Sequence, residues 1–159
     1  MLRYIVLVFI MLVFVGCTGD ESISNHVVMA QDFLRHEGYE VVSYEGEGRR
    51  TFAKSDLLEL SNEQVWAVQY TEPDEYLNKQ IETVSFTVKN HPLDEQFNMG
   101  KTSVTVWLQN GEVIGGWSFP VSKKNDVAGA PSSLDGKTAE EVQGDYSKWQ
   151  EQWREKYGE

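Results

Sequence analysis

Apolar residues that recur three or four positions apart predict two amphipathic helices, because this spacing places them on one helical face. One covers residues 23–36 and the other residues 145–157. Residues 55–60 predict a short helical segment. Thr138-Ala139-Glu140-Glu141 has the spacing of a capping box, which indicates that another helical turn begins there.

Alternation of apolar and polar residues predicts strands over residues 81–88 and 102–108, since side chains on a strand point to opposite faces in turn. Asn110-Gly111 follows the second strand, and this dipeptide is typical of a tight hairpin turn. Residues 113–119 are therefore expected to return as the partner strand. Pro120 ends it, because proline cannot donate to the hydrogen-bond ladder.

Residues 39–44 and 65–70 are rich in β-branched and aromatic side chains, which favours two further strands. Glu45-Gly46-Glu47-Gly48 predicts a turn after the first of them. The order of helix, strands, hairpin and helix predicts an α+β fold. We expect an antiparallel sheet of about four to five strands, with N- and C-terminal helices packed on one side.

The first 16 residues have a different pattern. Residues 5–15 form an unbroken apolar run of 11 residues, and polar residues follow it closely. A membrane-spanning helix needs about 20 apolar residues, so the run is too short to span a bilayer. Its length and position are typical of the hydrophobic core of a signal peptide.

Phe14-Val15-Gly16-Cys17 resembles a lipobox, the processing signal of bacterial lipoproteins. The resemblance implies that a diacylglyceryl group is attached to the sulfur of Cys17 and that the chain is cut between Gly16 and Cys17. Phe14 stands where leucine is usual, and Arg3 is the only cation before the apolar run. The alternative is an incidental cysteine in a simple secretory signal or short anchor.

These predictions divide the chain into a signal peptide (residues 1–16), a lipidated tether (17–24) and one α+β domain (25–159). We expect the protein to be lipid-anchored on the extracytoplasmic face of the cell membrane. The chain has 14 Lys and Arg against 25 Asp and Glu, a net charge of −11. That balance argues against nucleic acid as a partner, because phosphate binding needs a basic face. One cysteine excludes an intrachain disulfide.

No strong catalytic or cofactor-binding motif is present, and no cofactor is expected. The segment from Gly116 to Pro120 resembles the nucleophile elbow G-x-S-x-G, with Ser118 as the serine, but Pro120 replaces the final glycine of that motif. His91, with Asp94 and Glu95, is a weak candidate for a divalent metal site; the alternative is a polar turn with local hydrogen bonds. The predicted C-terminal helix carries an aromatic stripe, either buried core or a binding platform: Tyr146, Trp149, Trp153 and Tyr157.

Residues 87–94, 111–120 and 133–138, together with the aromatic C-terminal helix, resemble small lipoproteins of Gram-positive, Bacillus-type bacteria. The resemblance implies an extracytoplasmic domain of unassigned activity and transfers no catalytic residue. We expect a non-catalytic module that binds a protein, peptide or envelope polymer. Two alternatives remain: an envelope enzyme that uses His91 with nearby carboxylates, and a structural or inhibitory domain that docks on a neighbouring membrane protein.

Overall fold

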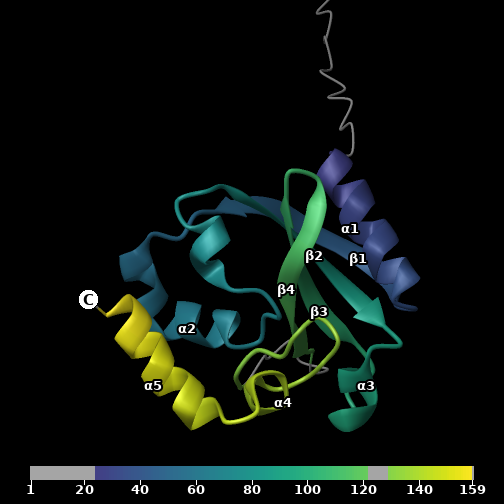
Figure 1. Ribbon diagram of the computed structural model, residues 1–159. Helices are drawn as coiled ribbons and strands as arrows, with labels where there is room; N and C mark the ends of the chain where they lie inside the picture. The colour runs from purple at the N-terminus through teal and green to yellow at the C-terminus, as the bar shows by residue number, and fades with distance from the viewer. Residues whose placement is uncertain (1–23, 122–128, 159) are drawn as a thin grey trace, which may run out of the picture.

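A computed structural model of the chain describes residues 24–121 and 129–158, and Figure 1 shows one open antiparallel sheet with helices on both sides. The strands are β1 (Glu40–Arg50), β2 (Ile81–Lys89), β3 (Thr102–Gln109) and β4 (Glu112–Pro120). They lie in the order β1-β2-β3-β4, so each strand pairs with its neighbour in sequence. The predicted α+β fold with an antiparallel sheet is confirmed.

Five α-helices and two short 3-10 helices accompany the sheet within the described residues. They are α1 (Asn25–His36), η1 (Lys54–Leu58), α2 (Leu60–Trp66), η2 (Pro73–Tyr76), α3 (Pro92–Gln96), α4 (Ala139–Gln143) and α5 (Tyr146–Tyr157). Side-chain caps begin α1 at Ser24, α4 at Thr138 and α5 at Asp145, as serine, threonine and aspartate commonly do. The predicted helices at both ends are confirmed where they fall on described residues.

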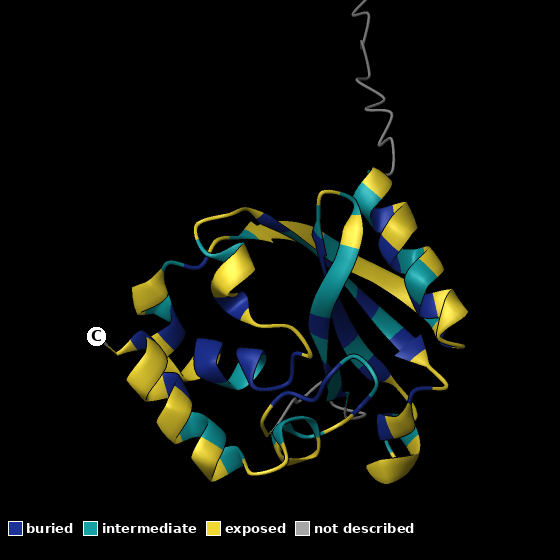
Figure 2. Ribbon diagram, viewed as in Figure 1, coloured by how far each residue is buried: buried dark blue, intermediate teal, exposed yellow. Residues whose placement is uncertain are grey.

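The two terminal helices contact opposite faces of the sheet, which corrects the expectation that both pack on one side. Strand residues Val84, Val104 and Val106 face α1 and form one hydrophobic cluster with it. Trp107, one position along β3 from Val106, points to the other face, since side chains alternate along a strand. Trp107 joins a second cluster with α2 and α5, which includes Trp153. Figure 2 shows buried residues concentrated in the strands between these helices.

The hairpin between β3 and β4 is confirmed. Asn110 and Gly111 both have positive φ, at 51° and 85°, as the turn that joins two twisted strands with two residues requires. Shortly before this turn, the pairing of β3 with β4 shifts register between Trp107 and Leu108. The strand ends at Pro120, as expected.

Two local predictions are wrong. Residues 65–70 are not a strand, because Val65 and Trp66 close helix α2 and a turn follows. Short apolar runs of this kind fit a buried helix as well as a buried strand. The predicted turn at residues 45–48 is also wrong: β1 continues through it, with a register shift between Tyr44 and Gly46. Gly46 has a φ of 136°, so it supplies the irregularity that a β-bulge needs.

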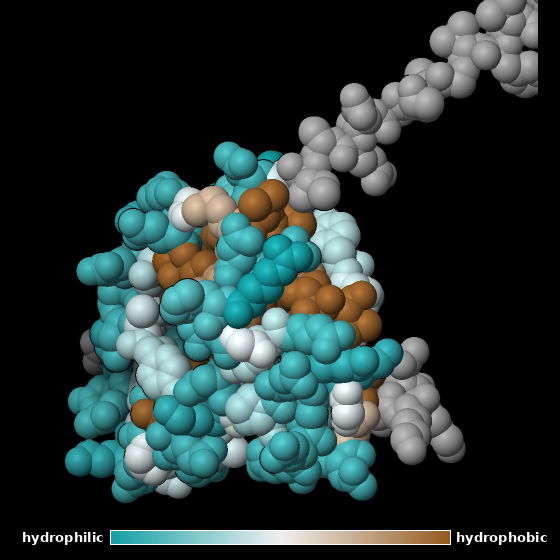
Figure 3. All heavy atoms as spheres, turned by 90° about the vertical axis from the view of Figure 1, so that its right-hand side faces the viewer, coloured by the Kyte–Doolittle hydropathy of each residue, from teal (hydrophilic) through white to brown (hydrophobic). Residues whose placement is uncertain are grey.

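The α1 side of the molecule carries hydrophobic patches separated by hydrophilic residues (Figure 3). Val28 and Met29 of α1 are 43% and 37% exposed, and Val42 of β1 is 39% exposed. Hydrophilic atoms interrupt these patches, so the visible surface does not form one continuous apolar face.

Candidate ligand-binding pocket

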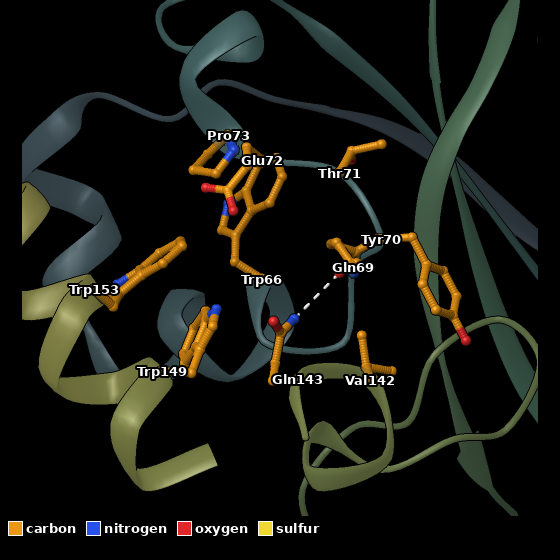
Figure 4. Close-up of a pocket in the computed structure, with 10 residues that line it drawn as sticks. All are labelled: Trp66, Gln69, Tyr70, Thr71, Glu72, Pro73, Val142, Gln143, Trp149 and Trp153. Carbon is orange, nitrogen blue, oxygen red and sulfur yellow. Dashed lines mark hydrogen bonds between the residues drawn. The ribbon is translucent and has the colours of Figure 1, made fainter. Parts of the chain in front are cut away.

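A pocket of about 140 Å³ lies where three segments distant in sequence meet: the end of α2 with the loop that follows it, α4, and α5. Figure 4 shows the side chains arranged around it. The lining residues are Trp66, Gln69, Tyr70, Thr71, Glu72, Pro73, Val142, Gln143, Trp149 and Trp153.

Aromatic packing fixes one wall of the pocket. Trp66 is 2% exposed and packs edge-on against Trp107 of the sheet, with ring centroids 5.1 Å apart. Trp153 is 4% exposed, and its indole N–H donates to the carbonyl oxygen of Leu57 at 2.8 Å. Trp149 is half-buried and stacks on Trp153 at 4.7 Å between centroids. The aromatic stripe of α5 therefore joins the core at Trp153 and reaches the pocket at both tryptophans.

Gln69 attaches the loop after α2 to the edge of the sheet. Its side-chain amide donates to the carbonyl oxygens of Val65 at 2.7 Å and Gly116 at 2.8 Å. Its oxygen accepts from the Gly116 N–H at 2.8 Å. The amide thus bonds the outer edge of β4 as a neighbouring strand would, and the loop cannot shift without breaking these bonds.

Gln143 attaches α4 to the same loop. Its side-chain nitrogen donates to the carbonyl oxygens of Ala67 at 2.9 Å and Gln69 at 3.3 Å. The dashed line in Figure 4 marks the second of these bonds, and the Gln143 side-chain oxygen lies on the Trp149 side of the amide. Because the nitrogen is engaged by the backbone, the orientation of the amide is determined, with its oxygen on the Trp149 side.

Tyr70 forms the outer rim and is 64% exposed. Its hydroxyl donates to both carboxylate oxygens of Asp135 at 2.9 Å, and Lys137 forms an ion pair with the same carboxylate at 3.1 Å. Burial acts to raise the pKa of Asp135, but hydrogen bonds from Ser133, Lys137 and Tyr70 outweigh it and hold that pKa below its usual value. Asp135 therefore stays ionised and keeps Tyr70 in position.

Glu72 is an exposed carboxylate on the opposite rim. One of its oxygens lies 3.2 Å from the ammonium nitrogen of Lys156, which also bonds Asp74. The hydrogen bond from Lys156 lowers the pKa of Asp74, and the same bond raises the pKa of Lys156. Asp74 and Lys156 therefore stay ionised near neutral pH. With Glu72, the group contains two acids and one base, a formal charge of −1.

The indole nitrogen of Trp66 has no hydrogen-bond partner within the described part of the chain, although the atom is buried. Buried polar atoms are nearly always bonded, so an unbonded one beside a pocket is an unusual feature.

His91, the weak metal candidate, has both ring nitrogens engaged by the backbone. Nδ1 accepts from the Leu93 N–H at 3.2 Å, so Nε2 carries the hydrogen and donates to the carbonyl oxygen of Leu134 at 3.0 Å. The hydroxyl of Tyr39 donates to the same carbonyl at 3.1 Å. His91 is 1% exposed, and burial lowers its pKa. This geometry matches the alternative of a polar turn with local hydrogen bonds.

The carboxylates near His91 do not face a shared metal position. Asp94 accepts from the His91 N–H at 3.3 Å and from the Thr102 hydroxyl at 2.7 Å, and Glu95 is exposed. No group of three or more His, Cys, Asp or Glu side chains suited to a metal ion occurs among residues 24–121 and 129–158. Asp94 thus caps α3 and bonds to the start of β3.

Ser118 is buried within strand β4, and its hydroxyl donates to the carbonyl oxygen of Ser133 at 2.6 Å. It does not lie on a strand-to-helix turn, which a nucleophile elbow requires. Gly16 and Cys17, where cleavage and lipidation are predicted, lie outside the described residues.

Sequence reasoning identified Trp149 and Trp153 but missed the polar part of the pocket. Gln69, Glu72 and Gln143 carry no motif, and the mistaken strand over residues 65–70 concealed the turn on which Gln69 lies. The Gly115-Gly116 pair gave an indirect signal: a Cβ on Gly115 would lie 2.2 Å from the Gln69 side-chain oxygen. Two glycines in an edge strand commonly mark a place where another chain segment approaches closely.

The chain matches no protein-family model, no curated protein and no solved structure. Among the residues that the structure describes, no helix has the length and apolar character needed to cross a membrane.

Proposed function

We propose that this protein is a lipoprotein anchored on the extracytoplasmic face of the cell membrane, and that its domain binds a ligand in the pocket without transforming it. Two features support the anchor: the short apolar run over residues 5–15 and the Gly16-Cys17 pair directly after it. Two acyl chains on one sulfur anchor a protein stably, whereas a single chain binds only marginally.

The position of the pocket favours exposure to the medium outside the membrane rather than contact with the lipid. In Figure 1 the start of α1 lies at the top of the molecule, whereas α4 and α5 lie at the bottom and lower left. Residues 17–23 can span at most about 25 Å, since an extended chain advances about 3.3–3.6 Å per residue. A lipid on Cys17 therefore keeps the α1 end near the membrane and leaves the pocket on the more distant part of the domain.

The chemistry of the lining carries the proposal of binding. Glu72 is the one ionisable carboxylate among the ten lining residues, and these include no histidine, cysteine, serine, lysine or arginine. The Thr71 hydroxyl donates to the carbonyl oxygen of Ile114 at 3.3 Å. Nucleophilic catalysis needs a nucleophile bonded to a base, and the Thr71 hydroxyl bonds this carbonyl oxygen rather than the Glu72 carboxylate. Aromatic rings with a few fixed polar groups are typical of ligand-binding pockets.

Metabolic labelling with an alkyne analogue of palmitate tests the anchor. We expect label on the wild-type protein, and neither label nor membrane retention for Cys17→Ser. Persistent labelling of Cys17→Ser would contradict lipidation at this residue.

Capture of envelope material tests the binding function. The lipid-free mature chain, residues 17–159 with Cys17→Ser, contains all the described elements and both hydrophobic clusters. Immobilised on beads, it should retain a protein, peptide or polymer from an envelope extract, and the additional change Trp149→Leu should abolish that retention. Equal retention by both forms would show that the pocket is not the binding site.

A further inference from the structure

We propose that the pocket binds an organic ammonium group, an inference that rests on the proposed binding function and specifies its ligand. The group is either a quaternary ammonium or the primary ammonium of a lysine-like chain. Three observations carry it: the aromatic wall, the acceptors that remain available, and the charge around the opening.

The aromatic wall suits a cation with apolar surface. Indole rings have a negative face that attracts an ammonium ion lying within about 6 Å of the ring centre, and tryptophan is the strongest such partner. Trp66, Trp149 and Trp153 border the same small space from two different helices (Figure 4). Trp66 and Trp153 are fixed by packing, so the wall exists before any ligand arrives. Such preorganisation reduces the free energy needed to order the site.

The polar groups directed at this space include two acceptors. Gln143 uses its side-chain nitrogen on the backbone and directs its oxygen to the Trp149 side, as Figure 4 shows. Glu72 also lines the pocket, and Lys156 contacts one of its two carboxylate oxygens. A ligand with N–H donors or positive charge can therefore bond these groups without displacing the contacts that hold the pocket together.

The charge around the opening also favours a cation. Glu72, Asp74 and Lys156 together carry one net negative charge, and the whole chain carries −11. A negative body raises the local concentration of cations and repels carboxylates and phosphates. The volume of about 140 Å³ is well above the roughly 10–15 Å³ that one water needs, so the space admits a small organic group. Tetramethylammonium is such a group.

Two-dimensional NMR of the ¹⁵N-labelled lipid-free mature chain tests the inference, because each tryptophan gives its own indole N–H signal. The probes are tetramethylammonium chloride, n-butylammonium chloride and tert-butanol, a neutral molecule of the shape of tetramethylammonium. Sodium chloride keeps the ionic strength constant. We expect saturable shifts of pocket indole signals with at least one ammonium probe and none with tert-butanol.

Three variants locate the site. Glu72→Gln and Trp149→Leu should each weaken ammonium binding about fivefold or more, the size expected when a cation loses one close aromatic or charged partner. Glu75→Gln is the matched control, because Glu75 is an exposed acid of the short helix η2, which Glu72 directly precedes, and it does not line the pocket. Glu72 is exposed, so Glu72→Gln should fold normally even if Trp149→Leu does not. Circular dichroism checks both.

The probes also distinguish the two sources of the ammonium group. Tighter binding of tetramethylammonium indicates a quaternary headgroup, and tighter binding of n-butylammonium indicates a lysine-like chain. Equal binding of tert-butanol, no saturable shift with either ammonium, or equal weakening by Glu72→Gln and Glu75→Gln each overturns the inference. If neither ammonium probe binds while envelope capture still depends on Trp149, the proposed binding function stands and only the ligand class is wrong. If neither ammonium binding nor Trp149-dependent capture is observed, both the ligand class and the binding function are wrong.

Discussion

Replacement of Gln69 with leucine removes three hydrogen bonds, two to the outer edge of β4 and one to α2, with little change in side-chain volume. Gln69 is 4% exposed, so water does not readily replace its amide. The N–H and carbonyl oxygen of Gly116 and the carbonyl oxygen of Val65 would all lose a partner. We therefore expect the substitution to destabilise both the sheet edge and the loop that forms the pocket.

The size of the effect follows from the bonds lost. A hydrogen bond contributes about 0.5–1.5 kcal/mol net, and a buried group left without a partner costs about 1–3 kcal/mol. Added leucine burial offsets part of this loss, and water reaching Gly116 offsets another part. We expect the free energy of unfolding to fall by about 2–4 kcal/mol, a large fraction of the roughly 5–15 kcal/mol typical of a domain.

Urea unfolding at pH 7, followed by tryptophan fluorescence and by circular dichroism, measures this change. Gln96→Leu is the control, because Gln96 is exposed on α3 and should change stability by less than about 0.5 kcal/mol. Gln69→Glu adds a diagnostic: its carboxylate can accept from the Gly116 N–H but opposes the carbonyl oxygens of Val65 and Gly116. Stability should therefore recover as pH falls and the carboxyl gains a proton. A loss below about 1 kcal/mol for Gln69→Leu refutes the role given to this side chain.

Three further predictions concern the core and the helix contacts. Burial lowers the pKa of His91, so as pH falls the unfolded chain takes up a proton at this residue before the folded chain does. The free energy of unfolding should therefore decrease below about pH 6.5. In urea titrations His91→Gln should lack this decrease, whereas His36→Gln, a change at an exposed histidine, should keep it. Leu34→Ala should cost about 2–5 kcal/mol in urea unfolding, because Leu34 is fully buried between α1 and the sheet. Trp153→Phe should cost about 1–2 kcal/mol in the same assay, since it loses the bond to the Leu57 carbonyl oxygen.

Local patterns predicted the elements whose apolar residues recur with one clear period. Strand β2 alternates buried Val84, Phe86 and Val88 with half-buried residues between them. Strand β3 is buried on both faces, but Val104 and Val106 flank the polar Thr105, so the alternation is still visible in the sequence. The segment at residues 65–70 has no such period, because Trp66, Ala67, Val68 and Gln69 are all buried by different neighbours. A run that is buried on every side carries no periodic signal, and helix and strand then look alike.

The pocket depended on contacts that no local pattern encodes. The aromatic stripe on the predicted C-terminal helix was visible in the sequence, but its partner Trp66 lies more than 80 positions earlier. Gln69 and Gln143 act through backbone groups of other segments, and any glutamine has the same bonding groups. Their roles follow from where α2 and α4 come to lie, which is a property of the tertiary fold.

The proposed anchor and the proposed ligand place opposite demands on the charge of the domain. Removal of residues 1–16 takes away Arg3 and no acid, so the mature chain has 13 basic residues against 25 acidic ones, a charge of −12. Such a body is repelled by anionic lipid, so the lipid that we propose on Cys17 would hold it at the membrane without electrostatic help. The same charge attracts an ammonium ligand to Glu72. Raising the salt concentration screens charges, so it should weaken ammonium binding in the pocket while membrane retention of the lipidated protein persists.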